Sequence, residues 1–195
     1  MSAITRTRSA ESDLLRTFGI FAECLLTGVW ILVAALPLVT LPAAVAAGAA
    51  HLRRHLDHRE SGWRQFAADW RSAVRRGWLA GTLGWGALAL LWADLAAVRA
   101  GLPGGVVVGA VGVLAALVVV VGGLRAAVSW RPGASWRALS GAAAQRTVRD
   151  PAGSLVLVCG FGVIAASAWF AAPLAAPAVG IVTAAALAVE RRRTH

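Results

Sequence analysis

All basic residues of this chain are arginines, and they are excluded from four long apolar stretches. The sequence has 195 residues with 19 arginines and no lysine. A charged side chain at the centre of a bilayer costs about 3 kcal/mol on insertion scales, whereas each apolar side chain gains about a few tenths of a kcal/mol there. This separation is therefore typical of a protein with several membrane-spanning helices. The stretches without arginine are residues 17–52, 78–98, 102–124 and 152–189.

The composition also favours a lipid environment. Hydrophobic residues make up 58% of the chain and charged residues only 14%, whereas soluble domains carry about 25% charged residues. The formal net charge is +10, and a basic protein of this kind would be a candidate nucleic-acid binder if it were soluble. Because the arginines flank apolar stretches, anionic lipid headgroups are their nearest counter-charge. We therefore expect contacts with lipid and no binding of nucleic acid.

Prolines and glycines divide the apolar sequence into membrane segments. Residues 18–52 would form one helix of roughly 50 Å, against a hydrocarbon core of about 30 Å. Pro37, Thr40 and Pro42 mark a break, because each proline removes a backbone donor and clashes with the preceding turn. We predict an all-α polytopic transmembrane bundle that forms one integral membrane domain over residues 1–195. Five full spans are expected at about 18–36, 78–98, 104–124, 152–171 and 174–189, plus a short broken or re-entrant segment at 42–52.

The arginines of the connecting segments predict the orientation of the bundle. The loop 53–77 holds seven arginines, the loop 125–150 holds five and the C-terminal tail holds three. Because arginine is enriched in cytoplasmic loops, we expect both loops and the C-terminus on the cytoplasmic side of a bacterial inner membrane. The side of the N-terminus depends on whether 42–52 crosses the bilayer. We favour a crossing, which places the N-terminus in the cytoplasm and leaves only Arg99 outside.

Each basic loop is predicted to contain an amphipathic helix at the membrane surface. Aromatic residues recur at helical spacing in the first loop with arginines on the opposite face, and two Trp–Arg pairs repeat this pattern in the second loop. Tryptophan rings and guanidinium groups suit the headgroup level of a bilayer. This surface is interpreted either as a docking site for anionic lipid or a partner, or as an anchor that orients the next span. Its residues are Trp63, Arg64, Phe66, Trp70, Arg71, Trp78, Trp130, Arg131, Trp136 and Arg137.

A few polar and aromatic residues inside apolar sequence are candidates for transport chemistry. Glu23 lies near the inward end of the first predicted span and Asp94 near the outward end of the second. A carboxylate in a membrane span is a candidate proton or cation site, although at these depths it can also reach the interface. Trp78, Trp85 and Trp92 are spaced seven apart on one helical stripe. Such a stripe would line an aromatic conduit or form a packing seam.

The sequence contains one weak metal-binding pattern and no catalytic motif. His51, His55 and His58 fall on one helical face, and imidazoles so arranged can bind a metal ion. However, no complementary ligand cluster occurs elsewhere, and a solvated helix face explains the pattern equally well. Nucleophile-elbow, phosphate-loop, Cys-x-x-Cys and zincin spacings are all absent. We therefore expect no metal, no cofactor, no catalytic residue and no enzyme activity.

The proline break and the first Trp–Arg segment resemble sequences of a known family. The segment 36–43 (LPLVTLPA), followed by WRQF at 63–66 and WR at 70–71 before the next span, is similar to the YesL-type bacterial membrane proteins, a domain family of unknown function (DUF624). The resemblance covers most of the chain, including its size and its order of spans. It implies an integral membrane protein of bacteria, often encoded near carbohydrate-uptake or carbohydrate-degradation systems. It assigns no catalytic residue.

These observations predict a protein that acts by association. The informative polar residues cluster at the predicted cytoplasmic surface rather than inside the spans, so we expect an accessory or regulatory partner of a transport system, such as one for carbohydrate uptake. The alternative is a small transporter or channel. It would use the broken first segment as a re-entrant element and Trp85, Trp92 and Asp94 as lining.

Overall fold

The computed structural model describes residues 2–57, 59, 62–100, 105–170 and 175–191, and all regular structure in these residues is helical. The all-α class expected from the sequence is therefore confirmed for this part of the chain. The elements are α1 (Ser2–Ala34), the short 3-10 helix η1 (Leu38–Thr40), α2 (Leu41–Leu56), α3 (Trp63–Arg99), α4 (Gly105–Val128), α5 (Trp136–Arg149), α6 (Pro151–Phe170) and α7 (Ala175–Arg191).

Two of these helices, α3 and α4, are long and apolar enough to cross a membrane alone. Helices α5 and α6 meet that criterion only as a pair, and they are bent by 104° at their junction. The apolar parts of α1 and α7, Phe18–Ala34 and Pro177–Glu190, are shorter than a typical span. The described residues therefore support a membrane protein with two or three candidate spans. The predicted count of five full spans is not confirmed.

The break between the first two helices follows from its prolines. Helix α1 ends at Ala34, before Pro37, and α2 begins at Leu41 with Pro42 in its first turn, where the missing proline N–H costs no helical hydrogen bond. The Thr40 hydroxyl oxygen lies 2.7 Å from the carbonyl oxygens of both Ala34 and Pro37. The hydroxyl therefore has two acceptors within reach at the end of α1, where carbonyls lack helical partners.

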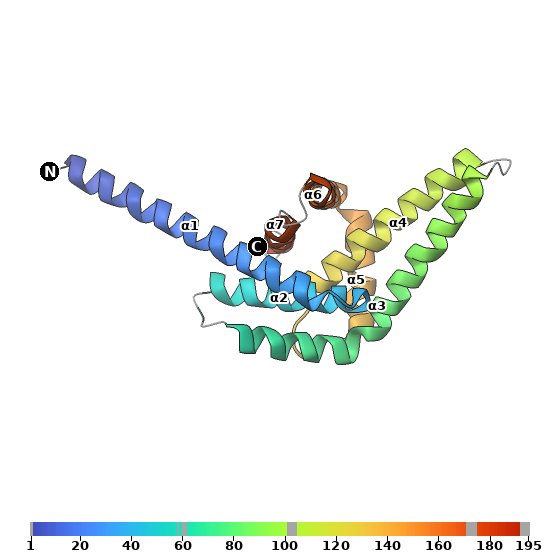
Figure 1. The fold of residues 1–195 in the computed structure, drawn as a ribbon, viewed down its shortest axis with the longest axis horizontal. Helices are drawn as coiled ribbons and strands as arrows, with labels where there is room; N and C mark the ends of the chain where they lie inside the picture. Colours follow the sequence, from blue (N-terminus) through green and yellow to red (C-terminus); the bar gives the residue numbers. More distant parts are fainter. Residues whose placement is uncertain (1, 58, 60–61, 101–104, 171–174, 192–195) are drawn as a thin grey trace.

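Helix α3 joins two segments that were predicted to be separate helices. The predicted surface helix of the first basic loop and the span predicted at 78–98 form one continuous helix of 37 residues, about 55 Å long. No proline interrupts the sequence between Trp63 and Arg99, so the backbone hydrogen bonds continue. In Figure 1 the first part of α3 runs beside α2, and the second part turns away to form a hairpin with α4.

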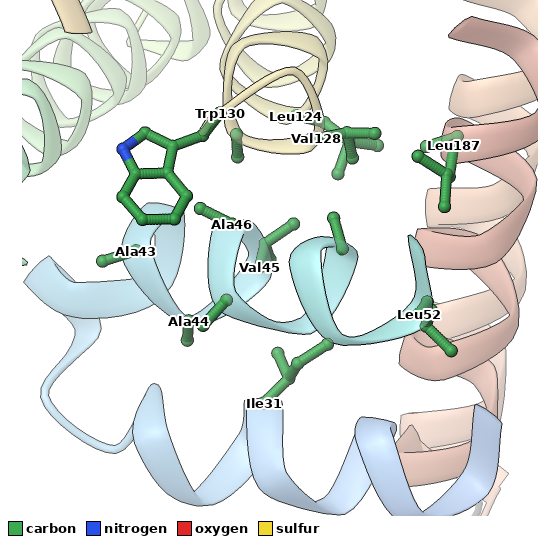
Figure 2. Close-up of a cluster of buried hydrophobic side chains, with 14 of the residues drawn as sticks. Ile31, Ala43, Ala44, Val45, Ala46, Leu52, Leu124, Val128, Trp130 and Leu187 are labelled. Atoms are coloured by element: carbon green, nitrogen blue, oxygen red, sulfur yellow. The ribbon is translucent and has the colours of Figure 1, made fainter. Parts of the chain in front are cut away.

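Helix α2 is the centre of the core. Its residues 43–52 are all buried, and most of them are alanine or glycine, which allows neighbouring helices to approach closely. Figure 2 shows Ile31 of α1 reaching α2 from one side and Trp130 lying over the other side, with Leu187 of α7 near its end. The α3–α4 hairpin is different, because many of its apolar side chains, such as Leu83 at 72% and Val106 at 87%, are exposed. Such a surface suits contact with lipid.

Candidate functional site

The last turns of α2 carry polar side chains that contact two neighbouring helices. His51 is buried, and its Nε2 atom lies 2.5 Å from Glu23 Oε1 on α1. One turn later, Arg54 donates a hydrogen bond to Asp69 on α3 and forms an ion pair with it. Asp69 is itself buried, so its negative charge is compensated inside the protein. These two pairs connect α2 to α1 and to α3.

Arg53 connects α2 to the end of α4. Its Nη1 atom donates to the Val128 carbonyl, and its Nη2 atom donates to the Trp130 carbonyl at 2.6 Å. The last carbonyl groups of a helix lack helical partners and carry partial negative charge. A guanidinium at this position therefore caps α4, and it fastens the base of the α3–α4 hairpin to the core.

A second cluster of paired charges joins α4, α5, α6 and α7. The Arg125 side chain is only 2% exposed, and its Nη2 atom lies 3.0 Å from Asp150 Oδ2 and 3.4 Å from Ser154 Oγ. Its Nη1 atom lies 4.0 Å from Glu190 Oε2, and Glu190 also pairs with Arg146. Because a buried charge is tolerated only with such partners, this cluster determines how the four helices meet.

Other arginines are left on the surface of α3. Arg64, Arg71 and Arg75 are exposed, and their spacing places them on one stripe of the helix. None of the ion pairs found among the described residues involves them. Trp78, which is 54% exposed, borders this stripe. Trp63, which is 52% exposed, lies about 100° around the helix from Arg64, and its ring contacts Trp30 and Phe66. We call these five residues the Arg–Trp face.

The other aromatic residues of the predicted interface lie inside the protein. Phe66 and Trp130 are 1% exposed and Trp136 is 6% exposed, so their rings contact protein. Trp136 Nε1 donates to the Ala73 carbonyl at 3.3 Å. The ring covers Gly77, where a Cβ atom would lie 2.5 Å from the indole nitrogen.

The rest of that predicted set is placed closer to the surface. Trp70 is partly buried against the core. Arg131 and Arg137 are exposed. In both Trp–Arg pairs of the second basic loop, therefore, the arginine is solvent-accessible and the tryptophan before it is a packing residue.

One tryptophan of the predicted stripe holds the break between α1 and α2. Trp85 Nε1 donates to the Leu38 carbonyl at 2.7 Å, and a Cβ atom at Gly81 would lie 2.2 Å from the Val39 carbonyl oxygen. Irregular backbone at membrane depth needs such coverage, because lipid offers no hydrogen bonds. The other possible lining residues, Trp92 and Asp94, are exposed on α3.

The histidines are placed differently from one another. His51 faces Glu23, and its Nδ1 atom is buried without a hydrogen-bond partner. His55 is partly exposed, and His58 lies outside the described residues. Among the described residues, no group of three His, Cys, Asp or Glu side chains is arranged to hold a metal ion.

The charge pairs inside the fold were not anticipated from the sequence. A usable signal existed for one of them, because Glu23 and His51 are polar residues inside the same arginine-free stretch, on either side of the proline break. A chain that folds back at such a break brings its two arms together. No comparable signal links Arg125 to Asp150 and Glu190, since their pairing depends on how four helices cross.

No family model matches the chain, and neither a curated protein nor a solved structure matches it.

Proposed function

We propose that this chain is an integral protein of a bacterial inner membrane that acts by association, as an accessory or regulatory partner of a transport complex. The observation that carries the proposal is the division of its arginines into two groups. Arg53, Arg54, Arg125 and Arg146 are used in internal contacts. The arginines of the Arg–Trp face are exposed and available to an external anion.

The Arg–Trp face has the chemistry of a docking surface for anionic groups. Guanidinium groups form charge-assisted hydrogen bonds with phosphates and carboxylates, and each basic residue near an anionic leaflet contributes about 1 kcal/mol of attraction. The two exposed tryptophans suit the boundary between apolar chains and headgroups. The face therefore favours a position at the inner leaflet, in contact with anionic headgroups or with the acidic surface of a membrane partner.

The orientation belongs to the same proposal. Arg53 and Arg125 lie at the end of α4 that forms the base of the α3–α4 hairpin, and Arg99 lies at the other end of α3. The positive-inside rule then favours a cytoplasmic base and an external hairpin tip, with both termini in the cytoplasm. The likeness of segment 36–43 to the YesL-type family supports a link to carbohydrate uptake.

The alternative of a small transporter or channel has less support. Trp92 and Asp94, proposed as lining, are exposed on α3, and Trp85 is used to hold the Leu38 carbonyl. In the described part of the chain, the buried carboxylate of Asp69 is paired with Arg54. A single copy therefore offers no polar path along these side chains.

The test is purification of the full chain in native-like lipid discs, with identification and quantification of co-purifying proteins. We expect a membrane transport component at stoichiometric yield from the native chain and from the charge-preserving Arg64→Lys/Arg71→Lys/Arg75→Lys variant. Its yield is expected to fall at least several-fold in the corresponding triple glutamine variant. Arg99→Gln, at the far end of the same helix, serves as the control and is expected to retain the partner.

Two results would contradict the proposal. One is the absence of any stoichiometric membrane partner for the native chain. The other is substrate flux in liposomes that contain this chain alone, especially if Asp94→Asn or Trp85→Ala reduces that flux.

A further inference from the structure

A buried histidine and a carboxylate meet where α1 packs on α2. The His51 side chain is 1% exposed and the Glu23 side chain 22% exposed, and the two are joined by a contact of 2.5 Å between Nε2 and Oε1. The second ring nitrogen, Nδ1, has no hydrogen-bond partner. In the neutral tautomer that donates from Nε2 to the carboxylate, Nδ1 holds a free lone pair. This buried atom is the one position on the ring where a further proton can bind.

The same interface contains another unsatisfied polar atom. Thr27 lies one turn after Glu23 on α1 and is 0% exposed, and its hydroxyl group has no hydrogen-bond partner. Residues four apart lie on one helix face, so Thr27 and Glu23 both belong to the surface that α1 presents to its neighbours. Buried polar groups are normally paired. Two unpaired polar atoms therefore lie in the contact between α1 and α2.

The charges that surround His51 leave Glu23 as its principal partner. The groups that act on the ring electrostatically are Glu23 of α1 and Arg54 and His55 of α2. Cys24 follows Glu23 on α1 and is buried as a free thiol. On the other helices that contact α2, three charged groups are engaged in pairs of their own: Asp69 of α3 with Arg54, Arg125 of α4 with Asp150, and Glu190 of α7 with Arg146.

We propose that Glu23 and His51 form a proton-binding site that couples acidification to the packing of α1 against α2. A proton taken up at Nδ1 converts the neutral imidazole into an imidazolium, whose Nε2–H still faces the Glu23 carboxylate. The new Nδ1–H is then a buried donor without an acceptor, so it favours a rearrangement of α1 that provides one. The site belongs to the helix interface and does not depend on the Arg–Trp face or on a partner protein.

The direction of the response follows from the burial of the ring. Because a buried imidazolium loses its hydration, a looser arrangement with a solvated ring binds the proton more readily. Acid therefore favours the looser arrangement. The α1–α2 contact is retained at neutral pH and weakens as the pH falls below about 6.5, the ordinary pKa of histidine.

Trp30 supplies a built-in reporter for this site. Its ring lies edge-on to the His51 ring, with centroids 5.0 Å apart and an interplanar angle of 66°. An imidazolium quenches the fluorescence of a neighbouring indole more strongly than a neutral imidazole does. The full chain in lipid discs is titrated from about pH 8 to about pH 5, the range over which histidine changes charge, while tryptophan emission is recorded.

We expect an acid-dependent loss of emission with a midpoint below about pH 6.5. This component is expected to disappear in His51→Gln and in Trp30→Phe, and to persist in the matched control His55→Gln on the next turn of α2. Glu23→Gln removes the carboxylate that stabilises the imidazolium, so the midpoint is expected to move to lower pH. A purely structural role of His51 would predict no such shift in midpoint.

Hydrogen exchange provides the second measurement. Amide exchange in α1 and α2 is expected to rise on acidification of the native chain and to rise less in His51→Gln. Should His51→Gln fail to fold, the comparison of the native chain with Trp30→Phe and Glu23→Gln decides the question. An emission titration that is unchanged in Trp30→Phe, or a midpoint that is unchanged in Glu23→Gln, would overturn the proposal.

Discussion

Replacement of Arg125 by methionine tests whether the second charge cluster holds the C-terminal helices together. Methionine keeps most of the apolar stem and volume of the side chain but removes the guanidinium. Arg125 lies 3.0 Å from the Asp150 carboxylate and 4.0 Å from that of Glu190. Those two side chains are only 13% and 19% exposed. The substitution therefore leaves two poorly solvated negative charges without the positive charge between them.

The expected loss of stability follows from what compensates these carboxylates afterwards. Removal of one partner from a buried ion pair costs about 3–5 kcal/mol when the other charge is left uncompensated. Here Asp150 still accepts a hydrogen bond of 3.0 Å from the Gly153 N–H, and Glu190 keeps its ion pair with Arg146. We therefore expect the lower end of the range, about 3 kcal/mol. For a chain of this size, that corresponds to a decrease in Tm of about 6–12 °C.

The assay is thermal unfolding of the full chain in mild detergent, followed by the fraction that remains monodisperse on size exclusion. Arg137→Met, an exposed position on α5, is the control and is expected to change the free energy of unfolding by less than about 0.5 kcal/mol. Adding Asp150→Asn to Arg125→Met neutralises the carboxylate nearest to the lost guanidinium and is expected to recover part of the loss. An Arg125→Met protein as stable as the Arg137→Met control would refute the reasoning.

Two further substitutions test close contacts of the fold. A Cβ atom at Gly180 would lie 1.9 Å from the Cys24 carbonyl oxygen, so Gly180→Ala is expected to separate α1 from α7 and lower Tm. A Cβ atom at Gly84 would meet nothing within 4 Å, so the control Gly84→Ala is expected to be neutral or slightly stabilising. Equal melting of the two variants would contradict this. Trp85→Phe removes the indole hydrogen bond to the Leu38 carbonyl, which keeps the hydrogen bond from the Leu41 N–H. The expected cost is about 1 kcal/mol, and faster amide exchange at the break between α1 and α2 is the expected signature. Unchanged exchange there would show that the hydrogen bond does not hold the break.

Local sequence patterns were sufficient for the helical class and for the main break. Pro37 and Pro42 interrupt backbone hydrogen bonding whatever surrounds them, and the observed gap between Ala34 and Leu41 agrees with this. The same local reasoning divided α3 in two, because polarity changes along it between the basic loop and the apolar segment. The polarity of the side chains decides what surrounds a helix, but a change in polarity does not interrupt its backbone hydrogen bonds. The helix therefore continues from Trp63 to Arg99.

The location of the aromatic side chains depended on packing. Trp63 and Phe66 belong to the same predicted apolar face, yet Trp63 is 52% exposed and Phe66 is 1% exposed. A helical period shows which residues share a face, but it does not show whether lipid or another helix covers that face. Here α2 covers part of it, because the alanines and glycines of α2 leave room for a close neighbour.

The sequence by itself determined that the apolar segments suit a lipid environment, that the fold is helical and that the chain breaks at its prolines. Each of these features depends on residues that are near one another in the chain. The tertiary structure decided which arginines are internal and which are available outside. Arg53 meets Val128 across 75 residues of sequence, Glu23 meets His51 across 28, and Arg125 meets Asp150 across 25. Such partners are chosen by the crossing of helices, because a charge that leaves water is stable only where the fold brings an opposite charge or a helix end beside it.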